Sequence, residues 1–94
     1  MNMVSLVGFL PHELELKASK NGIDMCSFKL CAYSGKSTQL LKCVSFGKIA
    51  QNMTKNLQKG ALISIGGHLE GYTLEIDGIS RLTMEIHVDT VHFL

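Results

Sequence analysis

The sequence contains no tryptophan and only one proline, and aromatic residues make up 6% of its 94 positions. Its longest apolar run is far shorter than the roughly 18–20 residues of a membrane-spanning helix, so we expect no membrane segment. The amino terminus lacks the basic start and the cleavage site of a signal peptide. The three cysteines, Cys26, Cys31 and Cys43, are an odd number that does not favour a disulfide framework, so a reducing compartment is expected.

The length predicts one domain covering residues 1–94, and the apolar fraction of 46% suffices for one core. The net charge of +1 conceals an uneven distribution. Residues 1–60 carry eight lysines and three acidic residues, a net charge of +5, whereas residues 61–94 carry one arginine and five acidic residues, a net charge of −4. This asymmetry favours a side that faces a polyanion, and ordinary solvated surface charge is the alternative explanation.

Alternating polar and apolar residues predict that most of the chain is β-strand. Asn21-Gly22 and Asp77-Gly78 are hairpin signals, and Pro11 ends the first strand. The expected strands cover residues 3–10, 13–18 (half-exposed), 25–33, 38–46, 61–69 and 81–93. The side chains expected to face inward are Phe28, Leu30, Ala32, Met84, Ile86 and Val88. Ile63, Ile65 and Leu69 are expected to share one face of their strand.

Residues 48–58 change period and predict one amphipathic helix. Ile49, Met53 and Leu57 recur every four residues, and Lys59-Gly60 is typical of a helix end. The resulting order, with one helix between the third and fourth main strands, favours an all-β OB-fold. That fold is a five-stranded, partly open Greek-key barrel.

Several segments of the chain form a recognisable series. They are the start, MNMVSLVGFL; Asn21-Gly22 followed by Phe28-x-Leu30; residues 43–52, CVSFGKIAQN, followed by LQKG at 57–60; residues 66–69; and the closing residues 85–94. In this order and spacing they resemble the first strand, the second strand, the strand-to-helix segment and the last strands of the bacterial and phage single-stranded-DNA-binding protein family. The order and spacing together are more specific than any single segment.

The resemblance implies an OB-fold that forms homodimers or homotetramers and holds single-stranded DNA on a basic groove with aromatic platforms. The residues that it places at the DNA are Lys29, Tyr33, Lys36, Lys42, Phe46, Lys48, Tyr72 and Arg81. Phe46 has a core position as its alternative, and solvated surface is the alternative for the lysines and Tyr33. The expected role is binding without sequence preference in replication, recombination or repair, in the cytoplasm at the nucleoid.

Some residues depart from the family pattern. The family commonly uses several tryptophans, and Leu40 and Leu74 lie near two of their positions. Glu70 lies where the family tends to be basic, and the loop after Tyr33 is short. The 94 residues also end without the acidic-tipped tail that recruits replication proteins, which resembles the tail-less primosomal relative of the family. The alternative function is therefore an adaptor for replication or primosome proteins with weak or no DNA binding.

No catalytic, cofactor or metal site is expected. Gly35-Lys36-Ser37 lacks the preceding glycine of a phosphate-binding loop, because Leu30 occupies that position. Cys26 and Cys31 lie five residues apart on one strand and point to opposite faces, and the same argument excludes His87 with His92 as a metal pair. No nucleophile, base and acid combination stands out, so we expect a binding protein and no enzyme.

Overall fold

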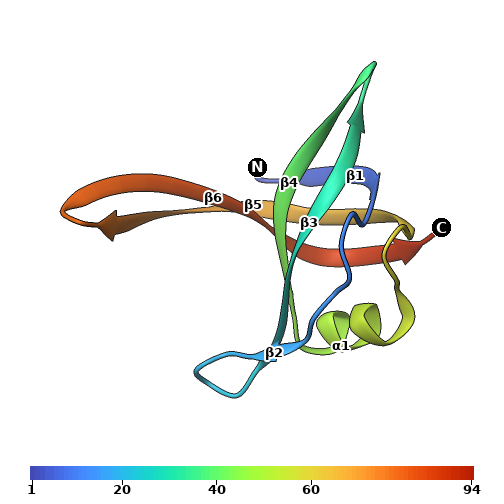
Figure 1. The fold of residues 1–94 in the computed structure, drawn as a ribbon, viewed down its shortest axis with the longest axis horizontal. Coiled ribbons are helices and arrows are strands. Elements are labelled where there is room, and N and C mark those ends of the chain that lie inside the picture. Colours follow the sequence, from blue (N-terminus) through green and yellow to red (C-terminus); the bar gives the residue numbers. More distant parts are fainter.

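Six strands and one helix account for most of the chain, and the computed structural model describes residues 1–94 (Figure 1). The elements are β1 (Val4–Phe9), β2 (Lys17–Ala18), β3 (Asp24–Ser34), β4 (Ser37–Phe46), α1 (Gly47–Asn56), β5 (Leu62–Ile76) and β6 (Ile79–Phe93). The structure contains no helix with the length and apolarity that crossing a membrane requires.

The sheet closes on itself. Its strand order is β1-β5-β6-β4-β3-β2, and β1 pairs with β3 as well as with β5. All pairings are antiparallel except the one between β4 and β6, which aligns Cys43 with Ile86 and Val44 with His87. Five long strands therefore form a barrel, with α1 between the third and fourth of them. This arrangement is an OB-fold and confirms the predicted fold class.

The closure of the barrel depends on a glycine in β1. Gly8 pairs with Ala32 of β3 and with Ile63 of β5. A Cβ atom at this position would overlap the carbonyl oxygen of Cys31 and lie 2.9 Å from Cα of Ala32. Only a residue without a side chain allows the two backbones to approach this closely.

Alternating side chains from the strands fill the barrel. On β3, for example, Cys26, Phe28, Leu30 and Ala32 are buried while the residues between them face outward. The helix covers one end of the barrel (Figure 1), and its apolar stripe is buried at Ala50 and Met53. The buried apolar residues of the core are Leu10, Cys26, Phe28, Leu30, Ala32, Cys43, Ala50, Met53, Leu57, Ile63, Ile65, Ile86 and Val88.

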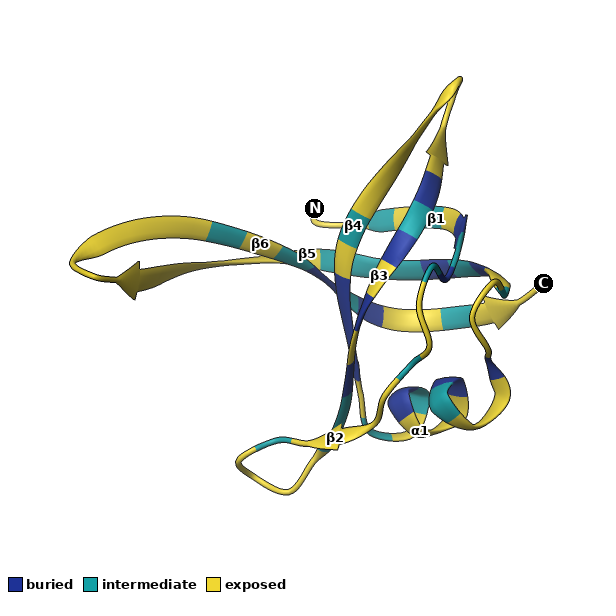
Figure 2. Cartoon of the chain, in the orientation of Figure 1, coloured by how far each residue is buried: buried dark blue, intermediate teal, exposed yellow.

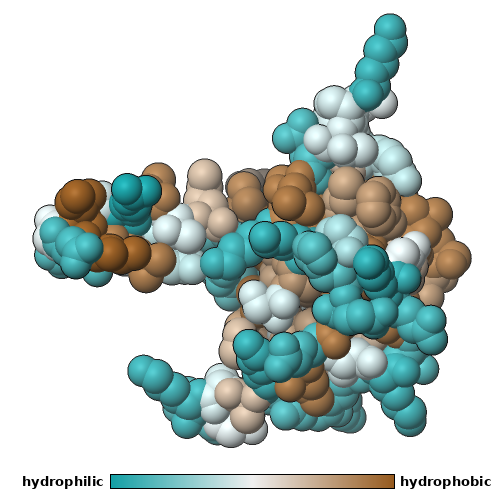
Figure 3. Space-filling view, viewed as in Figure 1, coloured by the Kyte–Doolittle hydropathy of each residue, from teal (hydrophilic) through white to brown (hydrophobic).

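Two hairpins extend beyond the barrel. The outer halves of β5 and β6 form a long arm, residues 69–85, that reaches away from the core, and the β3–β4 hairpin projects in another direction (Figure 2). The turn of the arm is Asp77-Gly78, where both residues have positive φ, as the predicted two-residue hairpin requires. Hydrophobic side chains are exposed along the arm (Figure 3).

Some boundaries and orientations differ from the sequence-based expectation. Of residues 13–18, only Lys17–Ala18 is a strand, and α1 ends at Asn56, so Gly60 is not its cap. Met84, predicted to face inward, is exposed because it lies on the arm beyond the barrel. Leu69, expected to share a face with Ile63 and Ile65, is exposed for the same reason, whereas those two residues are buried. Alternation within a strand identifies its two faces, but it does not indicate how far the barrel extends.

Candidate nucleic-acid interface

The registers of four adjacent strands define one continuous outer face. On β3 the face contains Met25, Ser27, Lys29, Cys31 and Tyr33, and on β4 it contains the residues paired with them, Phe46, Val44, Lys42, Leu40 and Thr38. The residues that alternate with these along each strand point to the core side of the sheet. The parallel β4–β6 pairing continues this face onto His87, and the β5–β6 pairing continues it onto His68. We use the term outer face for this side of the β3, β4, β6 and β5 strands.

Two predicted lysines are direct neighbours on the outer face. Lys29 of β3 is paired across the strands with Lys42 of β4, and both are exposed. Like charges directly opposite each other destabilise a sheet. The Lys42 Nζ atom lies 4.0 Å from Glu85 Oε2, so one carboxylate lies at the edge of this pair. The arrangement suits a surface that meets an external anion.

The predicted aromatic platform, Phe46, is on the surface. Its residue is 40% exposed, and its ring centroid lies 5.5 Å from that of His87 at an interplanar angle of 50°. The alternative core position is therefore wrong. Tyr33, 59% exposed, lies on the same face nearer the tip of the β3–β4 hairpin, where its ring centroid is 6.2 Å from that of Phe9.

The other four predicted residues lie at the margins of this face. Lys36 lies in the β3–β4 turn and Lys48 in the first turn of α1, both exposed. Tyr72 and Arg81 lie on the arm, at β5 and β6 positions with the same parity as His68 and His87. The structure thus groups Lys29, Lys42 and Phe46, and it places the remaining predicted residues along two projecting hairpins and the helix start.

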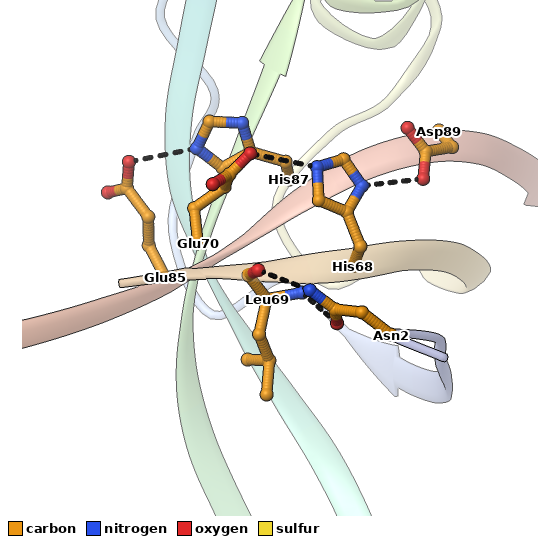
Figure 4. Close-up of polar contacts among 7 residues, drawn as sticks. All are labelled: Asn2, His68, Leu69, Glu70, Glu85, His87 and Asp89. Atoms are coloured by element: carbon orange, nitrogen blue, oxygen red, sulfur yellow. Dashed lines mark hydrogen bonds and ion pairs between the residues drawn. The ribbon is translucent and has the colours of Figure 1, made fainter. Parts of the chain in front are cut away.

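The sequence interpretation missed a cluster of histidines and acidic residues on β5 and β6 (Figure 4), and the His87 ring of this cluster lies beside Phe46. His68 Nδ1 lies 2.8 Å from Asp89 Oδ2, and His68 Nε2 lies 3.1 Å from Glu70 Oε1. His87 Nε2 lies 3.1 Å from Glu85 Oε1. The hydrogen bonds to Asp89 and Glu70 raise the pKa of His68 above its ordinary value of 6.5. Five titratable side chains therefore lie beside the aromatic platform.

Cross-strand pairing brings this cluster together. His68 is aligned with His87, and Glu70 with Glu85, although the two histidines are 19 residues apart in the sequence. A register shift between Gly66 and Gly67 leaves Asp89 opposite neither residue, and its side chain reaches His68. Prediction of the β5–β6 hairpin from Asp77-Gly78, with residues counted outward from the turn, would have paired these histidines.

A separate hollow lies between α1 and the end of β6. It is an open depression of about 740 Å³, and none of the eight predicted residues lines it. Its lining comes from one side of α1 and from the C-terminal end of β6. The residues are Ile49, Asn52, Asn56 and residues 89–93. It presents no lysine and no stacked aromatic pair, so the outer face is the better candidate for an anionic strand.

Comparison with known proteins gives the family to which the chain belongs. The model of the single-strand binding protein family matches residues 1–94, the whole of the chain. The chain belongs to the single-strand binding protein family. Its similarity extends to a single-stranded DNA-binding protein 1 from Staphylococcus aureus strain MSSA476, with 28% identity over 102 residues that cover 100% of this chain and 65% of that protein.

Two further single-stranded DNA-binding proteins are similar to this chain over its whole length. A single-stranded DNA-binding protein 2 from S. aureus strain Mu50 is 30% identical over 102 residues, covering 100% of this chain and 72% of that protein. A single-stranded DNA-binding protein from Bacillus cereus is 30% identical over 102 residues, covering 100% of this chain and 60% of that protein. The chain therefore spans 60–72% of the length of these family members.

Proposed function

We propose that this protein binds single-stranded DNA on its outer face, without sequence preference, in replication, recombination or repair. The observation that supports the proposal most strongly is the exposed ring of Phe46 on the same face as the Lys29–Lys42 pair. Aromatic platforms that stack bases, set beside cations that contact phosphates, are the two parts of a non-specific single-strand site. The names of the relatives point to the same ligand.

The lysine pair has a direct physical interpretation under this proposal. Lys29 and Lys42 repel each other in the free protein, because they lie opposite each other on an exposed sheet. A phosphate between them removes that repulsion and releases counterions from the DNA. Since a base has a π-face whatever its identity, stacking on Phe46 adds affinity that tolerates any sequence.

The alternative is an adaptor for replication or primosome proteins. The lack of tryptophan and the acidic residues Glu70, Glu85 and Asp89 near Phe46 are the features that favour it. Family membership and the exposed aromatic residues favour DNA binding instead. A pull-down that recovers a helicase or primase, from a protein that binds no single-stranded DNA, would support the adaptor.

The test is a titration of a fluorophore-labelled oligo-dT strand, followed by anisotropy at several salt concentrations. A label is needed because the protein has no tryptophan to report binding. We expect binding to the single strand, little binding to duplex, and a linear decrease of the logarithm of affinity with the logarithm of salt concentration. Each phosphate contact contributes about 0.7 to that slope for a single strand.

Charge-removing variants locate the contacts. Lys29→Ala combined with Lys42→Ala is expected to weaken binding and to reduce the salt slope by about 1.4, the contribution of two phosphates. Lys55→Ala combined with Lys59→Ala removes the same charge from exposed positions in and just after α1 and serves as the control. An equal loss in both variants would show that overall charge, not the outer face, determines binding.

We also propose that the protein self-associates as a homodimer or homotetramer, and that it acts in the cytoplasm at the nucleoid. The arm supports self-association because it exposes apolar side chains on both of its faces. These side chains are Leu69, Tyr72, Leu74, Ile76, Ile79, Leu82 and Met84. An exposed apolar surface of this kind is typical of a protein interface. A monomer by light scattering at micromolar concentration would contradict this proposal.

A further inference from the structure

Two histidines and a glutamate converge on the outer face where β5 and β6 leave the barrel. His68 and His87 are opposite each other in the β5–β6 pairing, and Glu70 shares their side of the strands. The two ring centroids are 5.6 Å apart. One ligand atom from each of the three residues lies within 4.8 Å of the other two. Figure 4 shows the three side chains gathered on one side of the two strands.

We propose that His68, Glu70 and His87 form a binding site for a divalent transition-metal ion, and that Zn²⁺ is the ion that fits best. Two imidazoles and one carboxylate are a known three-ligand set for zinc, with a fourth position left open. Calcium and magnesium prefer oxygen ligands throughout and are less suited to this set. The sequence interpretation assigned no metal site because it compared His87 with His92 and not with His68.

The distances are close to those that zinc requires. Zinc lies about 2.0–2.2 Å from nitrogen and oxygen ligands, so two ligands of a tetrahedral ion are roughly 3.4 Å apart. His68 Nε2 and Glu70 Oε1, at 3.1 Å, already have this spacing. The third ligand atom, on His87, lies within 4.8 Å of these two atoms and needs a further approach to reach the same spacing. The metal ion would then replace the proton between His68 and Glu70.

Two further carboxylates hold the histidines in the orientation that a metal needs. Asp89 Oδ2 lies 2.8 Å from His68 Nδ1, which leaves Nε2 for the metal. Glu85 Oε1 lies 3.1 Å from His87 Nε2, which leaves Nδ1 of that ring. A carboxylate on the second ring nitrogen is the usual partner of a histidine that binds zinc. The cluster thus contains both ligands and their supporting residues.

The backbone beneath the site is also fixed. The Asn2 side chain donates a hydrogen bond of 2.7 Å to the carbonyl oxygen of Leu69 and accepts one of 2.9 Å from its amide. Leu69 lies between His68 and Glu70, so these two bonds hold β5 at the point from which both ligands project (Figure 4). Side chains on a well-anchored strand keep their ligand geometry better than side chains on a loop.

A metal at this position would strengthen DNA binding, a consequence that rests on the proposed function. The cluster lies beside Phe46, where Glu70, Glu85 and Asp89 place negative charge near the expected path of the strand. A divalent cation offsets that charge, and its open coordination position can accept a phosphate oxygen. Bound zinc would therefore change an acidic part of the outer face into a site that binds the DNA phosphate.

Calorimetric titration of the protein with ZnCl₂, without DNA, tests the site directly. The expected result is one Zn²⁺ per chain. Asp89→Asn should weaken zinc affinity by about 10–100-fold, the range for a residue that supports a ligand, and His68→Ala or His87→Ala should weaken it further. Two controls, His92→Ala and Cys31→Ser, remove other potential ligands and should leave the affinity unchanged.

Three outcomes would overturn the metal site. They are no zinc binding by the wild-type protein, unchanged binding by the folded His68→Ala, His87→Ala double variant, or loss of binding in a control variant. The DNA consequence has its own readout, the affinity for labelled oligo-dT with and without Zn²⁺. Zinc binding with no gain in DNA affinity would refute only the consequence. Failure to bind DNA in either condition would refute the proposed function, while calorimetry still decides the metal site.

Discussion

Replacement of Phe46 by alanine is expected to weaken single-strand binding without unfolding the protein. The residue is 40% exposed and its ring lies beside His87 on the outer face, so part of the ring is open to a base. A base stacked on an aromatic side chain contributes about 1–3 kcal/mol. At about 1.4 kcal/mol per tenfold change in affinity, the dissociation constant should rise roughly 5- to 150-fold. Because stacking involves no charge, the salt dependence should not change.

Anisotropy titrations with oligo-dT measure both quantities. Phe46→Tyr keeps the π-face and should bind within a few-fold of the wild type. Phe93→Ala removes the same side chain from a similarly exposed position, 46%, beside the α1 hollow and outside the grouped lysines, and should have little effect. The stacking model is refuted at this residue if Phe46→Ala binds oligo-dT as tightly as the wild type, or if Phe93→Ala loses as much affinity.

Four further predictions concern the fold and the outer face. Gly8→Ala should lower the free energy of unfolding by about 1–3 kcal/mol, because the added Cβ would overlap the backbone of β3. Gly71→Ala should lower it less, because its Cβ would lie 3.7 Å from the nearest atom, and equal losses of the two variants in denaturant unfolding would contradict the role of Gly8 in closing the barrel. Lys29→Ala should raise stability by about 0.2–1 kcal/mol while weakening DNA binding, since it relieves the repulsion of the lysine opposite; a stability loss would show that the pair is not repulsive. Ser45→Ala should stabilise the protein by about 1 kcal/mol, because its buried hydroxyl lacks a hydrogen-bond partner, and a clear loss would indicate an additional partner. Cys43 should resist alkylation in the folded protein, as burial raises its pKa to about 12; mass spectrometry that finds it modified as fast as in denaturant would contradict its burial.

The fold was largely predictable because its signals are local. Alternation identified the buried side of the second barrel strand, the four-residue repeat identified the helix, and Asp77-Gly78 identified the turn of the arm. The length of the arm was not predictable in the same way. Leu69 and Met84 keep the inward parity, but no neighbouring strand covers them, and a single sequence does not state where a barrel ends.

The candidate site was predictable only in part, for a similar reason. Strand parity placed Lys42 and Phe46 on one face, and the resemblance to a family supplied their role. The acidic and histidine neighbours of Phe46 depend on the pairing of β4 with β6 and of β5 with β6, which joins distant segments. The Asp77-Gly78 turn gives the β5–β6 register, but the pairing of β4 with β6 that brings Phe46 beside His87 has no such local signal.

The central claim, that the outer face binds single-stranded DNA, is tested most directly by mapping the contact. Backbone and aromatic NMR signals of the isotope-labelled protein would be followed while unlabelled oligo-dT is added at low salt. The account predicts that the largest shifts fall on Lys29, Tyr33, Lys42 and Phe46 and extend onto the arm at Tyr72. Shifts centred on the hollow between α1 and the end of β6, or no shifts at all, would contradict it.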